Sequence, residues 1–349
     1  MFTRQSIVAY GKPLAETTSD LPEPCGSEIL LRVTHCGVCH SDIHLQDGYF
    51  DLGGDKKLDV TSGRPLPFTL GHEIAGTVEA LGPDAQGVRE GERYGAFPWI
   101  GCGSCGLCKR GDEHLCNRPA ALGITVDGGY ATHVTVPHPR YLLNVDGIAP
   151  ELAGSYMCSG LTAFSALRKA LPYLSAGPLM IVGLGGVGMM GLQFAKAQHD
   201  GPVYVADIDP EKREAALAHG AVEALDPANR DARKAFLKAT GGAGAVIDFV
   251  GAEASFNFAY GVAGKGGAVV VVGLMGGSVS MAVPLIPMRA VTVIGSYVGS
   301  LEETKEMLAL VKAGKVAAIP VETRDLSEAD AALNDLRDGK VLGRVVLTP

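Results

Sequence analysis

Residues 179–207, LMIVGLGGVGMMGLQFAKAQHDGPVYVAD, decide the fold of this chain. They read as a short apolar strand, a glycine-rich turn, a stretch with apolar residues at helical spacing, and a second apolar strand that ends in Asp207. The turn over residues 183–188 matches G-x-G-x-x-G, and Asp207 lies 24 residues beyond Gly183. A strand before the turn, a helix after it and an acid at the end of the next strand together indicate a dinucleotide-binding unit.

Each glycine of this turn has its own use. Gly183 permits the tight turn, Gly185 lets the backbone approach a pyrophosphate, and Gly188 allows the helix to pack closely on the strand. The N-terminus of the helix directs its positive end at the phosphates. Asp207 can accept hydrogen bonds from the adenosine ribose and would repel a 2′-phosphate, so the pattern favours NAD over NADP. The alternative is a strand–turn–helix unit that serves only packing.

Outward from this unit, the pattern of the chain changes at about residue 152. Beyond it, apolar strand candidates at 245–250, 268–273 and 291–295 alternate with helical stretches, which predicts an α/β fold with a doubly wound parallel sheet. A helix near 302–313 and a strand at 344–347 follow. Before residue 152, short alternating segments separated by Gly and Pro predict a mainly β region. A length of 349 residues fits two domains.

The composition argues against several classes of partner. Asp and Glu total 38 against 30 Lys and Arg, a formal net charge of -8, which speaks against nucleic acid and anionic membranes. Two uncharged stretches, 170–195 and 266–288, are interrupted by prolines and glycines, so we interpret them as buried strands joined by turns and not as membrane spans. The N-terminus has no basic region followed by an apolar run, so we expect a cytoplasmic protein.

Eight cysteines in a reducing compartment point to metal binding, because thiols stay free there. Four of them form C-x2-C-x2-C-x7-C, and they are Cys102, Cys105, Cys108 and Cys116. Four thiolates leave Zn(II) no open position, so such a site is structural. An iron–sulfur cluster and four unrelated buried thiols are the alternatives. The bacterial cluster pattern has a shorter last gap and a proline after the last cysteine, where this chain has Asn117.

A second set of residues could hold a zinc ion with an open position. Cys39 lies in G-V-C-H-S-D, His72 in G-H-E and Cys158 in M-C-S-G-L-T. Two thiolates and an imidazole are a three-ligand set of catalytic zinc, with the fourth position left for water or substrate. Cys36 makes a C-x2-C pair with Cys39, which could instead be half of a zinc knuckle. We prefer Cys39 because polar residues capable of proton transfer follow it. A metalloprotease H-E-x-x-H is excluded, because position 76 is Gly.

Together these motifs resemble the zinc-dependent medium-chain alcohol dehydrogenases over essentially the whole chain. The shared segments, in the family's order, are G-V-C-H-S-D, G-H-E, the four-cysteine loop, G-G-Y-A-T-H-V-x-V-P at 128–137, C-S-G-L-T, the dinucleotide turn, and G-R-V-V-L at 343–347. The resemblance implies a mainly β, GroES-like catalytic domain and a Rossmann coenzyme domain, with NAD, two Zn(II) per chain and a homotetramer or homodimer. It divides the chain into 1–153 and 296–349, which form the catalytic domain, and 154–295, which binds NAD.

The resemblance also implies roles for single residues near the open zinc site. Ser41 and His44 would form a proton relay. Asp42 would orient His72, and Glu73 would lie behind the zinc, able to approach it.

For the cofactor and substrate, the resemblance implies a longer set of contacts. The cofactor residues would be Gly183, Gly185, Gly186, Val187, Gly188, Asp207, Ile208, Lys212, Thr162, Gly273, Ser296, Val298 and Arg344. Of these, Lys212 would reach the adenosine ribose and Arg344 the pyrophosphate. Trp99, the only tryptophan, would line the substrate pocket.

We therefore expect reversible hydride transfer between a primary or secondary alcohol and NAD, with a small neutral alcohol or carbonyl compound as substrate and with neither nucleic acid nor membrane as partner. Zinc would polarise the alcohol oxygen, and its proton would leave through Ser41 and His44. Two alternatives stay open: a dehydrogenase of the same family for polyols, amino-acid alcohols or formaldehyde adducts, and a non-catalytic redox sensor that binds NAD and zinc. A polar stretch at 51–64 either folds over the substrate mouth or forms a solvated surface loop.

Overall fold

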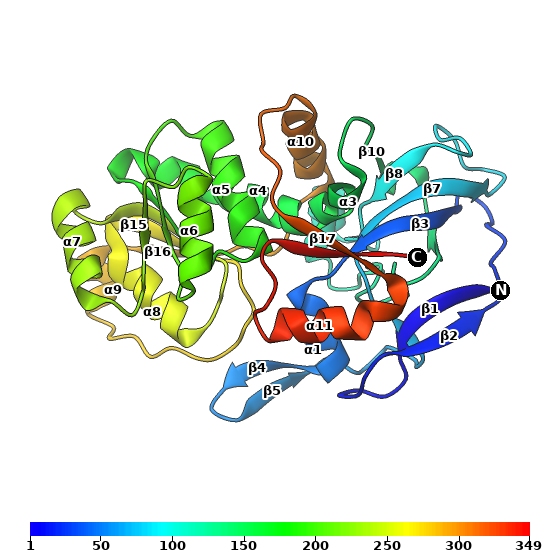
Figure 1. Ribbon diagram of the computed structural model, residues 1–349, viewed down its shortest axis with the longest axis horizontal. Coiled ribbons are helices and arrows are strands. Elements are labelled where there is room, and N and C mark those ends of the chain that lie inside the picture. Colours follow the sequence, from blue (N-terminus) through cyan, green and yellow to red (C-terminus); the bar gives the residue numbers. More distant parts are fainter.

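The structure, a computed structural model, describes residues 1–349 and contains two large sheets, one toward each end of the molecule (Figure 1). The first has six parallel strands in the order β13-β12-β11-β14-β15-β16. These strands are β11 (Leu179–Val182), β12 (Val203–Ala206), β13 (Glu223–Leu225), β14 (Ala243–Asp248), β15 (Ala263–Val271) and β16 (Thr292–Gly295). The central strands β11 and β14 are buried along their whole length, as is typical of a parallel sheet covered on both faces.

Helices connect these strands one by one. They are α5 (Gly186–Gln198), α6 (Pro210–Ala218), α7 (Arg230–Thr240), α8 (Glu253–Val262) and α9 (Leu285–Arg289). The α6 helix starts as its sequence suggests, because Asp209 accepts a hydrogen bond from the Glu211 N–H at 2.9 Å and Pro210 occupies the first turn. The predicted doubly wound parallel sheet is therefore confirmed.

The second large sheet is mixed and has seven strands, in the order β10-β8-β7-β3-β18-β17 with β9 paired to β3. Its strands are β3 (Ile29–Gly37), β7 (Glu73–Leu81), β8 (Arg93–Ala96), β9 (His133–Val136), β10 (Leu142–Asn144), β17 (Val321–Asp325) and β18 (Arg344–Thr348). The last strand pairs antiparallel with β3, placing Val346 opposite Gly37. Segments from the two ends of the chain thus lie side by side, red against blue in Figure 1.

The remaining elements are mostly short. Strands β1 (Phe2–Ile7), β2 (Ala15–Ser19) and β6 (Phe68–Thr69) form a small sheet. The helices are α1 (His40–Asp47), α2 (Gly106–Lys109), α3 (Pro150–Ala153), α4 (Ser159–Ala170), α10 (Leu301–Lys312) and α11 (Ala329–Arg337), with 3-10 turns at Glu113–Leu115, Pro139–Tyr141, Ser155–Met157, Leu171–Ala176 and Leu326–Glu328. Helices α4 and α11 are absent from the predicted elements. Nine of the 12 residues of α4 are buried, so it lacks the polar face that reveals a helix in a sequence.

The polar stretch at 51–64 belongs to an exposed hairpin of β4 (Tyr49–Gly53) and β5 (Lys56–Asp59). The Asp51 carbonyl accepts a hydrogen bond from the Gly277 N–H at 3.3 Å. A Cβ at Gly53 would lie 2.7 Å from the Ser278 nitrogen. The hairpin therefore reaches across to the segment that follows β15, while its outer surface faces solvent.

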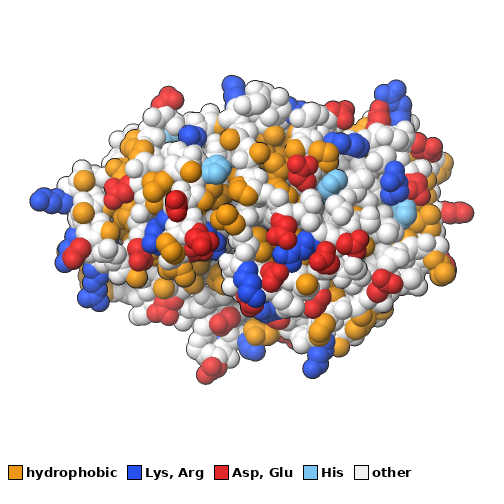
Figure 2. Space-filling view, in the orientation of Figure 1, with side chains coloured by type: hydrophobic (Ala, Val, Ile, Leu, Met, Phe, Trp, Pro, Cys, Tyr) orange, Lys and Arg blue, Asp and Glu red, His pale blue; other side chains and the backbone are white.

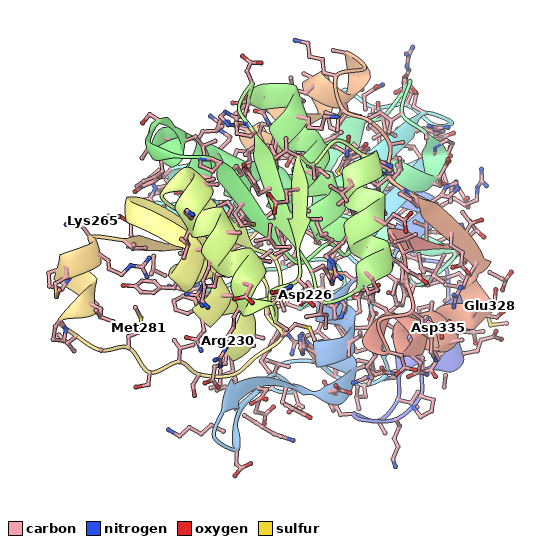
Figure 3. All side chains as sticks on the ribbon, turned by 60° about the vertical axis from the view of Figure 1, so that its left-hand side comes forward. Asp226, Arg230, Lys265, Met281, Glu328 and Asp335 are labelled. Atoms are coloured by element: carbon pink, nitrogen blue, oxygen red, sulfur yellow. The ribbon has the colours of Figure 1, made fainter.

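One apolar core of 66 buried residues contains side chains of both large sheets. None of the helices is both long and apolar enough to cross a membrane. Figure 2 shows acidic and basic side chains interspersed on one face, with no extended basic patch. Figure 3 shows Met281 on the extended segment that leads to α9, beside the six-stranded sheet.

Candidate active site

Three side chains that are far apart in the sequence meet where α1, β7 and α4 begin. Cys39 is the residue before α1, His72 precedes β7, and Cys158 is the residue before α4. The two sulfurs and an imidazole nitrogen all lie within 4.8 Å of one another, and all three residues are buried. Two thiols and an imidazole at these separations fit a zinc ion that keeps a fourth position open.

Hydrogen bonds fix the imidazole of His72. Its Nδ1 lies 3.1 Å from Oδ1 of Asp42, and both side chains are fully buried. The other carboxylate oxygen of Asp42 accepts hydrogen bonds from the Cys39 N–H and the Tyr130 hydroxyl, each at 2.9 Å. The Nε2 atom of His72 is buried and has no hydrogen-bond partner within the protein. A buried nitrogen without a partner is costly unless it binds something, so this atom fits a metal ion.

The charges of this cluster favour the thiolate of Cys39, which is its metal-binding form. A hydrogen bond from the Cys158 thiol, together with His72, holds the pKa of Cys39 well below its ordinary value despite burial. Burial would lower the pKa of His72, but Asp42 and Cys39 raise it well above its ordinary value. Cys39 and His72 therefore stabilise charge on each other, while the hydrogen bond to Cys39 and burial raise the pKa of Cys158 well above its ordinary value.

Glu73 lies directly beside this set and is fully buried. It accepts hydrogen bonds from the Ser159 backbone N–H at 3.3 Å and from the Ser159 hydroxyl, and it forms an ion pair with Arg344. Burial raises the pKa of Glu73, and Arg344 opposes that shift. Gly37 has to be glycine here, because a Cβ at that position would lie 2.0 Å from a Glu73 oxygen.

Arg344 connects this acid to the glycine-rich turn. A Cβ at Gly186 would lie 2.3 Å from Cδ of Arg344, so the arginine packs against the start of α5 while its guanidinium faces Glu73. The side chain predicted to reach the pyrophosphate is thus next to the turn, and in this structure its ionic partner is Glu73.

The glycine-rich turn has the geometry that its pattern predicts. Gly183 has φ +88°, and a Cβ at Gly188 would lie 1.8 Å from the Gly183 carbonyl oxygen, so both positions require glycine. Gly185 precedes α5, which begins at Gly186 and continues through Val187, while at Gly185 itself a Cβ would meet open space. The N-terminus of α5 is therefore accessible to a phosphate.

Asp207 lies at the carboxyl end of β12, beside this turn. Its carboxylate accepts hydrogen bonds from the Leu184 N–H at 2.6 Å and the Asp209 N–H at 2.9 Å. Ile208 is 78 % exposed. Lys212 points to Asp209, 3.6 Å away, and to the Gly339 carbonyl, 3.4 Å away.

The residues predicted to lie near the nicotinamide are spread over three segments. Thr162 is partly buried in the first turn of α4, and its N–H donates to the Cys158 carbonyl at 2.7 Å. Gly273 follows β15 and could not carry a Cβ, which would lie 2.1 Å from the Val250 backbone. Ser296 and Val298 follow β16, and Val298 is held at φ +48°. A β-branched residue in the left-handed region is strained, and such strain is typical of functional sites.

The predicted relay residues, Ser41 and His44, are both in α1 and partly buried. The structure shows no hydrogen bond between them. The His44 ring packs on Phe50 with 4.5 Å between centroids, and its Nε2 is buried without a partner. Burial lowers the pKa of His44, with Asp47 and Cys39 opposing.

The four-cysteine loop brings its sulfurs together at a second possible metal site. The four sulfurs lie within 4.8 Å of one another, with Cys105 3.4 Å from Cys108 and 3.9 Å from Cys116. Hydrogen bonds from the Ser104 hydroxyl and backbone N–H groups lower the pKa of Cys102 to about 5, which favours the thiolate. This closed set of four sulfurs fits a structural zinc ion.

Comparison with known proteins agrees with this geometry. Residues 26–146 match the family model of the alcohol dehydrogenase GroES-like domain, and residues 186–313 match that of zinc-binding dehydrogenases. The chain is 37% identical to an NAD-dependent alcohol dehydrogenase of Sulfurisphaera tokodaii, over 98% of this chain and 99% of that protein. A similar protein of Saccharolobus solfataricus, also named NAD-dependent alcohol dehydrogenase, is 36% identical over 98% of this chain and 99% of its own. The chain belongs to the zinc-dependent medium-chain alcohol dehydrogenase family.

A solved member of this family has the same fold. The crystal structure of the alcohol dehydrogenase from Aeropyrum pernix superposes with a TM-score of 0.89 at 29% identity, covering 99% of this chain and 100% of that one. The GroES-like fold predicted beside the Rossmann sheet is therefore confirmed.

Tyr297, which no sequence motif marks, borders the alcohol dehydrogenase site together with Trp99. Trp99 donates its indole N–H to the Met157 carbonyl at 3.0 Å, and its ring centre lies 5.5 Å from that of His72. Tyr297 packs on Trp99 with 5.8 Å between the ring centres, and Tyr297 is itself 45 % exposed. The only sequence signal for Tyr297 is its position between two predicted cofactor residues.

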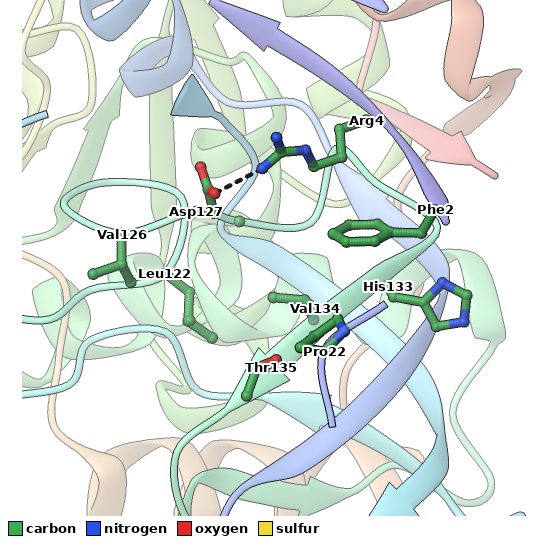
Figure 4. Close-up of a pocket in the computed structure, with 10 residues that line it drawn as sticks. Phe2, Arg4, Pro22, Leu122, Val126, Asp127, His133, Val134 and Thr135 are labelled. Atoms are coloured by element: carbon green, nitrogen blue, oxygen red, sulfur yellow. Dashed lines mark hydrogen bonds and ion pairs between the residues drawn. The ribbon is translucent and has the colours of Figure 1, made fainter. Parts of the chain in front are cut away.

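A separate hollow of about 260 Å³ lies by β1 and β9 (Figure 4). Its lining includes Phe2, Leu122 and Val134, together with the ion pair of Arg4 and Asp127 at 2.9 Å. None of the residues predicted for metal, cofactor or substrate lines it, so we do not place the active site there.

Proposed function

We propose that this protein is an NAD-dependent, zinc-dependent alcohol dehydrogenase that interconverts a small neutral primary or secondary alcohol and the corresponding aldehyde or ketone. The observation that carries the proposal is the buried, unpartnered Nε2 of His72 beside two thiols, at a site that Arg344 and Glu73 connect to the glycine-rich turn. When bound, zinc supplies a Lewis acid for the substrate oxygen, and NAD accepts the hydride.

The residues of the chain have distinct tasks in this reaction. Cys39, His72 and Cys158 hold the catalytic zinc, and Asp42 keeps the His72 tautomer whose Nε2 is free to bind it. Glu73 places a negative charge behind the ligands, where Arg344 balances it.

Proton transfer and substrate binding use other side chains. Ser41 takes the alcohol proton and passes it to His44, which is neutral at pH 7 because burial lowers its pKa. Trp99, which is buried, and Tyr297, which is 45 % exposed, border the site with aromatic surface that accepts a hydrocarbon substrate.

The residues that would hold the cofactor lie mainly at the carboxyl ends of the parallel strands. The turn at 183–188 takes the pyrophosphate, and Asp207 with Ile208 and Lys212 borders the adenosine ribose. Thr162, Gly273 and the segment 296–298 border the nicotinamide.

We also propose the domain division 1–153, 154–295 and 296–349, supported by the pairing of β18 with β3. The protein would act in the cytoplasm as a homotetramer or, failing that, a homodimer. Strand β16 is an unpaired edge of the parallel sheet, and apolar residues near it are exposed: Val283 is 72%, Met288 65% and Val293 47% exposed. A second copy of the chain would cover this apolar edge.

The test is an NADH absorbance assay with ethanol, benzyl alcohol and a diol, before and after metal chelation. We expect turnover of at least one alcohol, loss of turnover on chelation, and recovery with added zinc. A protein that binds NAD and zinc but oxidises no alcohol on a broad panel would be a redox sensor, and turnover of the diol alone would indicate a polyol dehydrogenase.

A further inference from the structure

A partly buried ammonium group lies behind the segment 296–298, and nothing in the proposed mechanism uses it. Lys169, in the last turn of α4, donates hydrogen bonds to the Ser165 hydroxyl at 2.7 Å and to the Ser296 hydroxyl at 3.1 Å. Both serines are buried. Lys169 forms no ion pair, and burial lowers its pKa, partly opposed by Glu303 and Asp112. A partly buried lysine held only by two neutral hydroxyls is costly for folding, which calls for a function.

The segment that Lys169 contacts needs to be held in place. Val298 adopts φ +48°, a conformation that costs a β-branched residue free energy. The Ser296 N–H bonds the Val271 carbonyl at 2.9 Å, and Gly299 packs on Leu161, where a Cβ would lie 2.7 Å away. Lys169 adds the one side-chain hydrogen bond to this segment from a neighbouring helix.

The same segment faces the open metal site. Tyr297 packs on Trp99, whose ring lies next to His72. The conformation of the residues on either side of Tyr297 therefore determines where this backbone segment lies relative to a molecule bound beside the metal ligands.

We propose that Lys169 is a positioning residue, which holds the segment 296–298 in the conformation that binds the nicotinamide end of the cofactor. This inference rests on the proposed function, because it takes NAD as the cofactor. A purely structural role would weaken binding of the whole cofactor, whereas this role predicts that loss of the ammonium group weakens only the binding of the nicotinamide end.

Titration calorimetry with NADH and with ADP-ribose, which lacks the nicotinamide, separates these roles. Lys169→Met keeps most of the length of the side chain but removes the donor. We expect NADH to bind about tenfold more weakly, the cost of one lost charged hydrogen bond, while ADP-ribose binds within about twofold of the wild-type protein. Ser296→Ala should have the same selective effect, and the double variant should be no worse than either. Lys169→Arg should recover part of the NADH affinity.

Arg168 provides the matched control. It is the neighbouring residue of α4, is exposed, and pairs with Glu306 on α10. Arg168→Met should leave both affinities unchanged.

An equal loss of NADH and ADP-ribose binding in both single variants, or no loss of either, would overturn the role of Lys169 while leaving the proposed function standing. If Lys169→Met does not fold, Ser296→Ala still decides between these results. A wild-type protein that binds neither NADH nor ADP-ribose would overturn the proposed function and, with it, this inference.

Discussion

Oδ1 of Asp42 lies 3.1 Å from Nδ1 of His72, and neither side chain is exposed to solvent. The carboxylate also accepts hydrogen bonds from three other donors, so it cannot turn away from the imidazole. The pair explains why the second imidazole nitrogen is left without a protein partner: it is directed at the two thiols.

Asp42→Asn should loosen the catalytic metal. Asparagine has one amide nitrogen in place of a carboxylate oxygen, and this nitrogen would face another hydrogen-bond donor. The His72 ring would therefore lose its fixed orientation, and we expect zinc affinity at this site to fall by about 10–100-fold. Zinc content after dialysis against a competing chelator should drop from two ions per chain toward one. Asp55→Asn, at an exposed position of the hairpin, is the control and should keep both ions. Retention of both zinc ions by Asp42→Asn would contradict this account.

Cys105→Ser should destabilise the protein without changing its substrate preference. The four-sulfur set loses one ligand and its zinc. We expect the thermal unfolding midpoint to fall by several degrees, which corresponds to a loss of a few kcal/mol in the free energy of unfolding. Cys25→Ser is the matched control, because Cys25 is exposed and belongs to neither metal set. Altered substrate preference with an unchanged midpoint would show that the loop is not a structural site.

Asp207→Gly should relax the choice of cofactor toward NADP. Removing the carboxylate removes its repulsion of a 2′-phosphate, so the ratio of kcat/KM for NADP to that for NAD should rise about tenfold or more. The substitution also removes hydrogen bonds to the Leu184 and Asp209 N–H groups, so Asp207→Asn, which keeps an acceptor, controls for damage to the turn. Negligible use of NADP by a folded Asp207→Gly protein would show that ribose recognition lies elsewhere.

The pH dependence of alcohol oxidation should show the low pKa of His44. Burial lowers this pKa below the ordinary value of 6.5, so the imidazole is neutral at pH 7 and becomes protonated only as the pH falls further. Because only the neutral imidazole can accept the relayed proton, its contribution to kcat should be present at neutral pH and be lost as the pH falls through the lowered pKa.

His44→Gln should remove this acidic step and lower kcat about tenfold or more. His199→Gln, at the end of α5, should leave the profile unchanged. A profile of His44→Gln that matches the wild-type protein would exclude His44 from the relay.

Local patterns made much of this protein predictable. Gly183, Gly185 and Gly188 lie within six residues of one another, and the four cysteines of the loop within 15, so their spacing in the sequence already limits how they can lie in space. The alternation of apolar strands with helices after residue 152 predicted the parallel sheet, because each strand and each helix shows its own periodicity within a short segment.

Other features could not be predicted in this way. Helix α4 is buried on nearly all sides, so no polar face marks it in the sequence. The contact of Tyr297 with Trp99 joins residues nearly 200 positions apart, and no short pattern surrounds Tyr297. The hairpin at 49–59 has few apolar residues because most of it is exposed, and that composition suits a loop equally well.

The sequence by itself determined the class of fold, the four-cysteine loop and the dinucleotide turn, because each depends on residue types at short spacing or on strand and helix periodicity. Three separate short motifs indicated Cys39, His72 and Cys158, and only the tertiary structure brings these side chains together. Only the tertiary structure decided that Arg344 pairs with Glu73, that the Nε2 atom of His72 is left without a partner, and that Lys169 lies behind Ser296. The physical reason is that these pairings arise when separate elements pack against one another, and the side chains involved carry no periodicity that reveals their neighbours across the fold.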